Sequence, residues 1–425
     1  MRPVLLLALM TATGLAPSGA RASFDEFGEG YIPASFTLNA KYLTLVLKGE
    51  IELELHDLEG EGGPGHDSPT DTKTLGTRSP FVEIDTFSLS LRVGFAETVW
   101  VYSILDFTMS DASVGAVFVD YRGAGPDWLE HHVEAGYNTP IVRIDRRTER
   151  QPLAASIYWR QPEVHLAWEG VFALASHVTL EVGASAAMMR PLGFATVQDS
   201  TAQASTINVL AYDRAATFSG NGGVYGGRLR LEVWGAFVDA FGFGGGLVAE
   251  SGTDVLRSGF SNYRDLPGYD ADQTASGDFY WFGGRVGYSG YGVSVVAEAV
   301  GSREDLLVRW TAYGQVGYRA ELRGDEGALL FRAIEPVVRY EAYRIEGSSD
   351  LTPSGRALRS TAPINAVSWD FDVLTVAVMT EVWGDFVKLR IEYTLLWEQN
   401  GVPALGISNA PFRNDELVVQ AELRF

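Results

Sequence analysis

The sequence predicts an all-β fold: a transmembrane antiparallel β-barrel of about sixteen strands, with long extracellular loops and short periplasmic turns. Three observations predict it. Segments of apolar–polar alternation recur along most of the chain, and the connections between them alternate between long and short. The composition has no cysteine, 12% aromatic residues and 47 glycines, and no stretch after the N-terminus is apolar enough for a spanning helix. A soluble β-sandwich gives no reason for the alternation of loop lengths.

The first residues have the features of a secretory signal peptide. Arg2 precedes the apolar run Val4–Met10, and Ala20-Arg21-Ala22 offers a small-x-small cleavage site. We therefore expect residues 1–22 to be a signal peptide and residues 23–425 to form a single outer-membrane barrel domain. Cleavage takes the formal net charge from −21 to about −23, because two arginines are lost.

The charges decide which side of each strand faces lipid. In Val387–Trp397 the odd positions are apolar, whereas the even positions include Lys388, Arg390 and Glu392. A charged side chain in lipid costs up to about 2–4 kcal/mol at mid-depth, so the odd side is expected to face outward. The closing stretch ELVVQAELRF alternates in the same way and ends on Phe425. We expect it to pair with the first strand and close the barrel.

The same alternation predicts sixteen strands along the mature chain. They are expected near 41–57, 81–93, 98–109, 113–122, 129–138, 164–174, 178–190, 223–235, 240–250, 278–288, 292–301, 305–320, 328–346, 366–382, 386–398 and 414–425. Long polar connections fall at 58–80, 139–163, 191–222, 251–277, 347–365 and 399–413. The alternation is broken at 110–112 and 302–304, where short links stand in place of long ones, so 139–163 is the third outer loop. Counted from a periplasmic N-terminus, every long loop lies outside and the last strand returns to the periplasmic face.

Three stretches together resemble the phosphate-selective porin O/P family. They are FSLSLRVGFAETVWVYSILDF (Phe87–Phe107), VFVDYRG with VEAGYNTP (Val117–Pro140), and IEPVVRYEAYRIE (Ile334–Glu346) with the C-terminal strand. The resemblance implies a sixteen-stranded outer-membrane barrel, usually a homotrimer, with an inward-folded third loop after GYNTP and basic side chains that attract phosphate. The chain departs from that family at Asn138, where a lysine is common, and at Ile141, where an aromatic residue is common. The chain is acidic, with four lysines against 29 arginines, so the barrel is better supported than phosphate selectivity.

Arginines are the candidate functional residues. The run VRIDRRTER places Arg143, Arg146, Arg147 and Arg150 in the third outer loop, as pore constriction candidates. Guanidinium groups stay charged and bind carboxylate or phosphate in bidentate fashion. Two interpretations stay open: an anion-attracting eyelet, and arginines that are solvated or bonded to wall carboxylates. The strand register adds the lumen-facing candidates Arg92, Arg228, Arg230, Arg285, Arg309, Arg339, Arg390 and Glu392.

No motif for covalent chemistry is visible: there is no Gly-x-Ser-x-Gly, His-Glu-x-x-His or phosphate-cradling glycine pattern. His131 and His132 are neighbours in a predicted strand and therefore face opposite sides. We expect no metal, no cofactor and no enzymatic activity.

The function that the sequence predicts is passive diffusion of small hydrophilic solutes through an outer-membrane porin of a Gram-negative bacterium. A preference for anions or phosphate is the sharper hypothesis. Two alternatives stay open. One is a barrel of another class, either an enzyme or an adhesion or structural barrel with a plugged lumen; the other is a soluble secreted β-protein. The expected partners are outer-membrane lipid and lipopolysaccharide, the solutes themselves, and the barrel-assembly machinery, which recognises terminal strands such as that of Phe425; no nucleic acid is expected.

Overall fold

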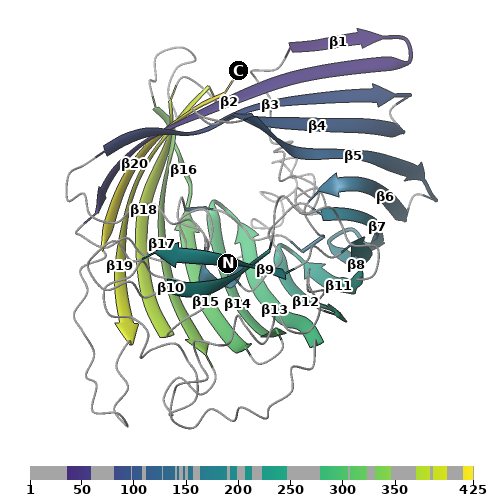
Figure 1. Ribbon diagram of the computed structural model, residues 1–425. Helices are drawn as coiled ribbons and strands as arrows, with labels where there is room; N and C mark the ends of the chain where they lie inside the picture. The colour runs from purple at the N-terminus through teal and green to yellow at the C-terminus, as the bar shows by residue number, and fades with distance from the viewer. Residues whose placement is uncertain are drawn as a thin grey trace, which may run out of the picture.

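A computed structural model shows a closed barrel of antiparallel strands (Figure 1). The structure describes residues 36–58, 81–96, 98–107, 112–126, 128–138, 141–142, 147–148, 152–156, 163–188, 192–198, 206–212, 223–246, 278–304, 307–322, 331–345, 370–382, 386–399 and 415–424. The predicted signal peptide, Arg143, Arg146, Arg150 and Phe425 lie outside these residues. Within them, no helix is long and apolar enough to cross a membrane.

Sixteen strands form the wall, as the sequence predicts. In chain order they are β2 (Leu43–Leu58), β3 (Phe81–Phe95), β4 (Val99–Phe107), β5 (Ala112–Ala124), β6 (Leu129–Asn138), β7 (Glu163–Ala175), β8 (Val178–Met188), β11 (Gly223–Val233), β12 (Ala236–Gly246), β13 (Asp278–Gly290), β14 (Val293–Glu304), β15 (Leu307–Tyr318) with its continuation β16 (Ala320–Glu321), β17 (Phe331–Ile345), β18 (Asp370–Val382), β19 (Val387–Gln399) and β20 (Glu416–Arg424).

The barrel closes where the two ends of the chain meet. β20 pairs with β19 on one side and with β2 on the other, with Leu423 opposite Ile51. Figure 1 shows the yellow β20 against the purple β2, so the ring has no open edge. Closure satisfies the backbone hydrogen bonds of each strand, which a β-structure inside a bilayer requires. This confirms the fold class that the sequence predicts.

A short strand that the sequence did not predict completes the seam. β1 (Phe36–Ala40) pairs with residues 43–47 of β2, beyond the point where β20 stops opposite Glu50. β1 and β20 run in the same direction along β2, so together they form one row of the wall from opposite ends of the chain. Five residues before a two-residue turn give too short a pattern to recognise by periodicity.

β2 and β19 show the apolar outer face and the polar inner face that the sequence predicts for them. On β2, Leu53 and Leu55 are exposed, whereas Glu52, Glu54 and His56, which alternate with them, are buried. On β19, the exposed positions are Leu389, Ile391, Tyr393 and Trp397, and Glu392 is buried between them. The predicted register is therefore confirmed on both strands, and its energetic reason is the cost of placing charge in lipid.

Tight turns connect the strands at the end opposite the long loops. Trp234–Gly235 and Tyr291–Gly292 each form a two-residue connection with positive φ at both positions: 55° and 80° in the first, 55° and 77° in the second. Such paired positive φ values suit the right-handed twist of the flanking strands. Trp234 and Tyr291 are exposed, in agreement with a girdle of aromatic rings at one rim of the barrel.

Two predicted boundaries are wrong. The strand expected at 240–250 is β12 at Ala236–Gly246, because the turn lies at Trp234–Gly235 and not at 236–239. The long connection expected at 191–222 contains a hairpin of β9 (Leu192–Gln198) and β10 (Thr206–Tyr212). A tryptophan with positive φ is uncommon, so the pattern of residues offers little reason to expect a turn at Trp234–Gly235.

Candidate functional site

The third outer loop crosses the inside of the barrel. It leaves the wall at the end of β6 and returns at β7, and its η1 turn (Leu153–Ser156) contacts β15 and β17. Seven strands separate β6 from β17 in either direction around the ring of sixteen. The loop therefore reaches the wall diametrically opposite its origin, and near its start Ile141 lies against Gly183 on the inner face of β8.

Three polar contacts anchor the loop to β17. Arg147 Nη1 donates to Glu335 Oε1 at 2.7 Å. Arg339 Nη1 donates to Thr148 Oγ1, and the backbone N–H of Leu153 donates to a carboxylate oxygen of Glu341. Alternate residues of a strand face the same side, so one inner row of β17 supplies all three partners.

The anchor residues on β17 also stabilise one another. Arg339 Nε donates to Glu341 Oε1 at 2.8 Å, and both side chains are fully buried. Removing one member of a buried, hydrogen-bonded ion pair is strongly destabilising, by about 3–5 kcal/mol. The two wall residues that bind Thr148 and Leu153 of the loop are therefore held in place by their own ion pair.

The structure places one of the four predicted constriction arginines. Arg147 lies inside the barrel and is bonded to the wall carboxylate of Glu335, which is the second of the two interpretations that the sequence left open. Asn138, at the start of the loop, donates from its amide to Glu134 at 2.8 Å, and its backbone oxygen contacts His165 Nδ1 at 3.1 Å. The chain departs from the resembled family at Asn138, and that position has a local structural role here.

The predicted lumen residues lie on the inner face of the wall. Those that are buried are Arg92, Arg228, Arg285, Arg309, Arg339 and Glu392; Arg230 and Arg390 are partly buried. They are spread over strands from β3 to β19, so they do not form one basic patch.

Two of these arginines, Arg228 and Arg285, belong to a row of alternating charge from β8 to β14. Arg228 Nε donates to both oxygens of Asp239 at 3.1 Å, and Arg285 Nε donates to Glu298 Oε2 at 2.6 Å. Arg285 also lies 3.9 Å from Asp239, and Arg228 lies 3.5 Å from Glu181. Since each guanidinium has a carboxylate beside it, this row cross-links strands and presents little net charge.

The closing seam carries a second polar network that the sequence did not reveal. His56 contacts Glu416 at 3.1 Å through Nδ1 and Glu54 at 2.8 Å through Nε2. Gln420 donates to Glu54 at 2.6 Å and accepts from Arg390 at 2.6 Å. The signal was available, because all five side chains occupy even positions of their strands, but the pairing of strands from opposite chain ends brings them together.

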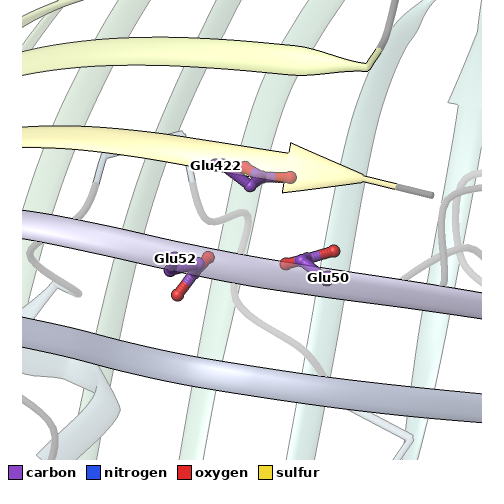
Figure 2. A group of neighbouring side chains, drawn as sticks. All are labelled: Glu50, Glu52 and Glu422. Atoms are coloured by element: carbon purple, nitrogen blue, oxygen red, sulfur yellow. The ribbon is translucent and has the colours of Figure 1, made fainter.

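Three carboxylates meet further along the same seam. Figure 2 shows Glu50 and Glu52 on the purple β2 and Glu422 on the neighbouring yellow β20, and their carboxylate oxygens lie within 4.8 Å of one another. Cations share this cluster: Arg424 contacts Glu422 and lies 3.6 Å from Glu50, and Lys388 lies 4.0 Å from Glu422. These side chains already neutralise much of the charge, so the cluster is a structural ion-pair network rather than a metal site.

His131 and His132 face opposite sides, as expected. His132 is buried on the inner face, 3.5 Å from Asp120, whereas the His131 ring lies 6.2 Å from that of Tyr121 on the outer face. The two rings therefore do not share a metal ion.

Comparisons with known proteins agree with the fold. No family model and no curated protein matches the sequence. The chain is similar in structure to OmpF of Salmonella typhi, solved with daunomycin (TM-score 0.52, 11% identity, 92% of this chain and 100% of that chain). It is also similar to the outer-membrane protein OmpT of Vibrio cholerae (0.49, 10%, 92% and 99%) and the outer-membrane channel DcaP of Acinetobacter baumannii (0.48, 11%, 91% and 99%).

At 11% identity the likeness to OmpF shows the fold alone: a closed antiparallel barrel of sixteen strands, as in outer-membrane porins. Membership in the phosphate-selective porin O/P family, which the motifs resemble, is not shown.

Proposed function

We propose that the protein is an outer-membrane porin through which small hydrophilic solutes diffuse passively. The proposal depends on one observation: the third loop crosses the lumen of a barrel of sixteen strands. It is anchored to the opposite wall at Glu335, Arg339 and Glu341. Barrels of sixteen to eighteen strands are wide enough for an aqueous channel, and a loop across the lumen narrows it. The lining is polar and charged, which suits water and hydrated solutes.

Planar-bilayer recording of the purified protein tests the proposal. Stepwise conductance increments in simple salt are expected, together with swelling of vesicles in small sugars. If the protein inserts as a heat-modifiable barrel but gives neither increments nor swelling, the porin proposal fails and a plugged barrel takes its place.

We propose further that the channel prefers anions, through the loop arginines Arg143, Arg146 and Arg150. The paired charges of Arg228, Asp239, Arg285 and Glu298 add little net charge to the lumen. We therefore attribute the preference for anions to this loop. Replacing these three by glutamine should lower the anion-to-cation permeability ratio, measured from reversal potentials in a salt gradient. Arg147→Gln is the matched control, because Glu335 already compensates that charge. An equal ratio in wild type and the triple variant would show that the loop does not set the preference.

The cellular setting is part of the same proposal. Residues 1–22 direct export, the assembly machinery recognises the strand β20, and the exposed apolar face contacts lipid and lipopolysaccharide. The resemblance to the O/P porins suggests in addition that three copies of the chain assemble as a homotrimer. Fractionation of cells expressing the full chain, followed by native gels in mild detergent, tests location and assembly. A soluble periplasmic product would refute the membrane assignment.

A further inference from the structure

A row of three buried side chains lies on the inner wall near the end that carries the long loops. Trp281 on β13 is opposite Ser302 on β14, and Ser302 is opposite Arg309 on β15. All three belong to the buried inner face, with exposures of 1%, 3% and 2%. Directly opposed residues on one face of a sheet have Cβ atoms about 5 Å apart, so these side chains share one small region of the wall.

The chemistry of this row suits an anion. Indole and guanidinium groups only donate hydrogen bonds, and a serine hydroxyl is a donor as well. Ser302 Oγ is buried and has no hydrogen-bond partner in the described part of the chain. Arg309 adds a permanent positive charge and donates from Nη1 to the Tyr343 hydroxyl at 3.5 Å. A bound carboxylate would accept from the hydroxyl and from the guanidinium.

Aromatic rings border the same row. The Trp281 ring stacks on Phe243, with centroids 4.6 Å apart and planes at 20°, and it meets Phe241 edge-on at 5.9 Å. All three rings face inward from β12 and β13. A guanidinium beside an apolar ring cluster matches an organic acid with an apolar body better than phosphate, which carries about −1.5 to −2 charge near neutral pH and has no apolar part.

We propose that Trp281, Ser302 and Arg309 bind the carboxylate of a small organic monoanion, with the ring or hydrocarbon body of that solute against Trp281 and Phe243. The site lies toward the long-loop end of the barrel on β13, β14 and β15, and Arg309 reaches Tyr343 on β17, the next inner-face residue after the loop anchor Glu341. It extends the proposed porin function by naming a solute class, and its binding step does not depend on conduction.

Calorimetric titration of the detergent-solubilised barrel with benzoate, acetate and inorganic phosphate tests the site. Benzoate is expected to bind more tightly than either of the other two. Ser302→Ala should lower the affinity for benzoate about tenfold, which corresponds to the loss of one hydrogen bond to a charged group. Ser185→Ala is the matched control: it is also a buried inner-face serine whose hydroxyl has no hydrogen-bond partner among the described residues, but it lies on β8.

Trp281→Phe keeps a ring and removes the indole N–H, so it separates stacking from hydrogen bonding if Ser302→Ala lowers the yield of folded barrel. Equal benzoate affinity in wild type, Ser302→Ala and Trp281→Phe would overturn the inference, as would phosphate displacing benzoate at equal concentration. In bilayers, benzoate added from the long-loop side should reduce the current with weak voltage dependence. A barrel that binds benzoate but does not conduct would refute only the porin proposal; a conducting barrel that ignores benzoate would refute only this site.

Discussion

Glu341→Gln should loosen the third loop without opening the barrel. The Glu341 carboxylate is fully buried and accepts hydrogen bonds from the Leu153 backbone and from Arg339. Glutamine has nearly the same size and keeps one acceptor oxygen, but it removes the charge. The substitution therefore weakens two contacts of one anchor, since Arg339 also donates to Thr148 in the loop.

The magnitude follows from the difference between charged and neutral hydrogen bonds. A bond to a charged group contributes about 1.5–3 kcal/mol, against about 0.5–1.5 kcal/mol for a neutral pair. Losing about 1 kcal/mol at the Leu153 contact, and a similar amount through Arg339, weakens the anchor by about 2 kcal/mol. Each 1.4 kcal/mol is a factor of ten, so the detached loop should be populated about 10- to 100-fold more often.

Single-channel recording detects that change as excess open-channel current noise and closure at lower voltage. Glu298→Gln is the control, because Glu298 is also a buried inner-face carboxylate, and it is bonded to Arg285 and Tyr313 of the wall. Both variants should show normal heat-modifiable mobility before they are compared. Wild-type noise in Glu341→Gln, or equal excess noise in Glu298→Gln, would refute the assignment of Glu341 as a loop anchor.

Three further predictions concern the wall. Ile391→Arg on the exposed outer face should lower the free energy of unfolding in lipid vesicles by about 2–4 kcal/mol in urea titrations; wild-type stability would place this face away from lipid. Gly136 has φ of 146°, and a Cβ there would lie 2.5 Å from a carbonyl oxygen of β5, so Gly136→Ala should reduce the folded fraction on gels. Gly314→Ala, where a Cβ meets nothing within 4 Å, should fold normally; similar defects in both would contradict the steric argument. Gln420→Leu should cost about 1–3 kcal/mol by removing the bond to Glu54 at the seam, and an unchanged melting temperature would show that the backbone ladder alone holds the closure.

The sequence predicted the wall because its physical cause is local and repeated. A charge that would otherwise face lipid costs several kcal/mol, so the alternation along β19 and β20 determines which side faces outward without knowledge of the partner strands. The same reasoning fails where a single residue overrides the pattern. Trp234 takes a positive φ at a tight turn, and residues 236–239 therefore belong to β12 although they were expected to form the connection.

The site was less predictable because its contacts join distant parts of the chain. Arg147 and Glu335 are 188 positions apart, and no periodicity relates a loop to the wall that it reaches. The resemblance to the O/P porins indicated that the loop folds inward, but not what holds it. Arg339 was predicted to face the lumen, and the alternation within IEPVVRYEAYRIE puts Glu335 and Glu341 on the same side of the strand, although neither was among the candidate lumen residues.

Pairing within the wall limits which arginines are able to determine ion preference. The Arg228 guanidinium lies 3.1 Å from the Asp239 carboxylate, and that of Arg285 lies 2.6 Å from Glu298. At a distance of several ångströms, an ion in the lumen experiences each such pair as a dipole, and salt screens what remains over about 8 Å at physiological ionic strength. The strand arrangement therefore uses these two arginines to join neighbouring strands, and they contribute little to a preference for one sign of ion.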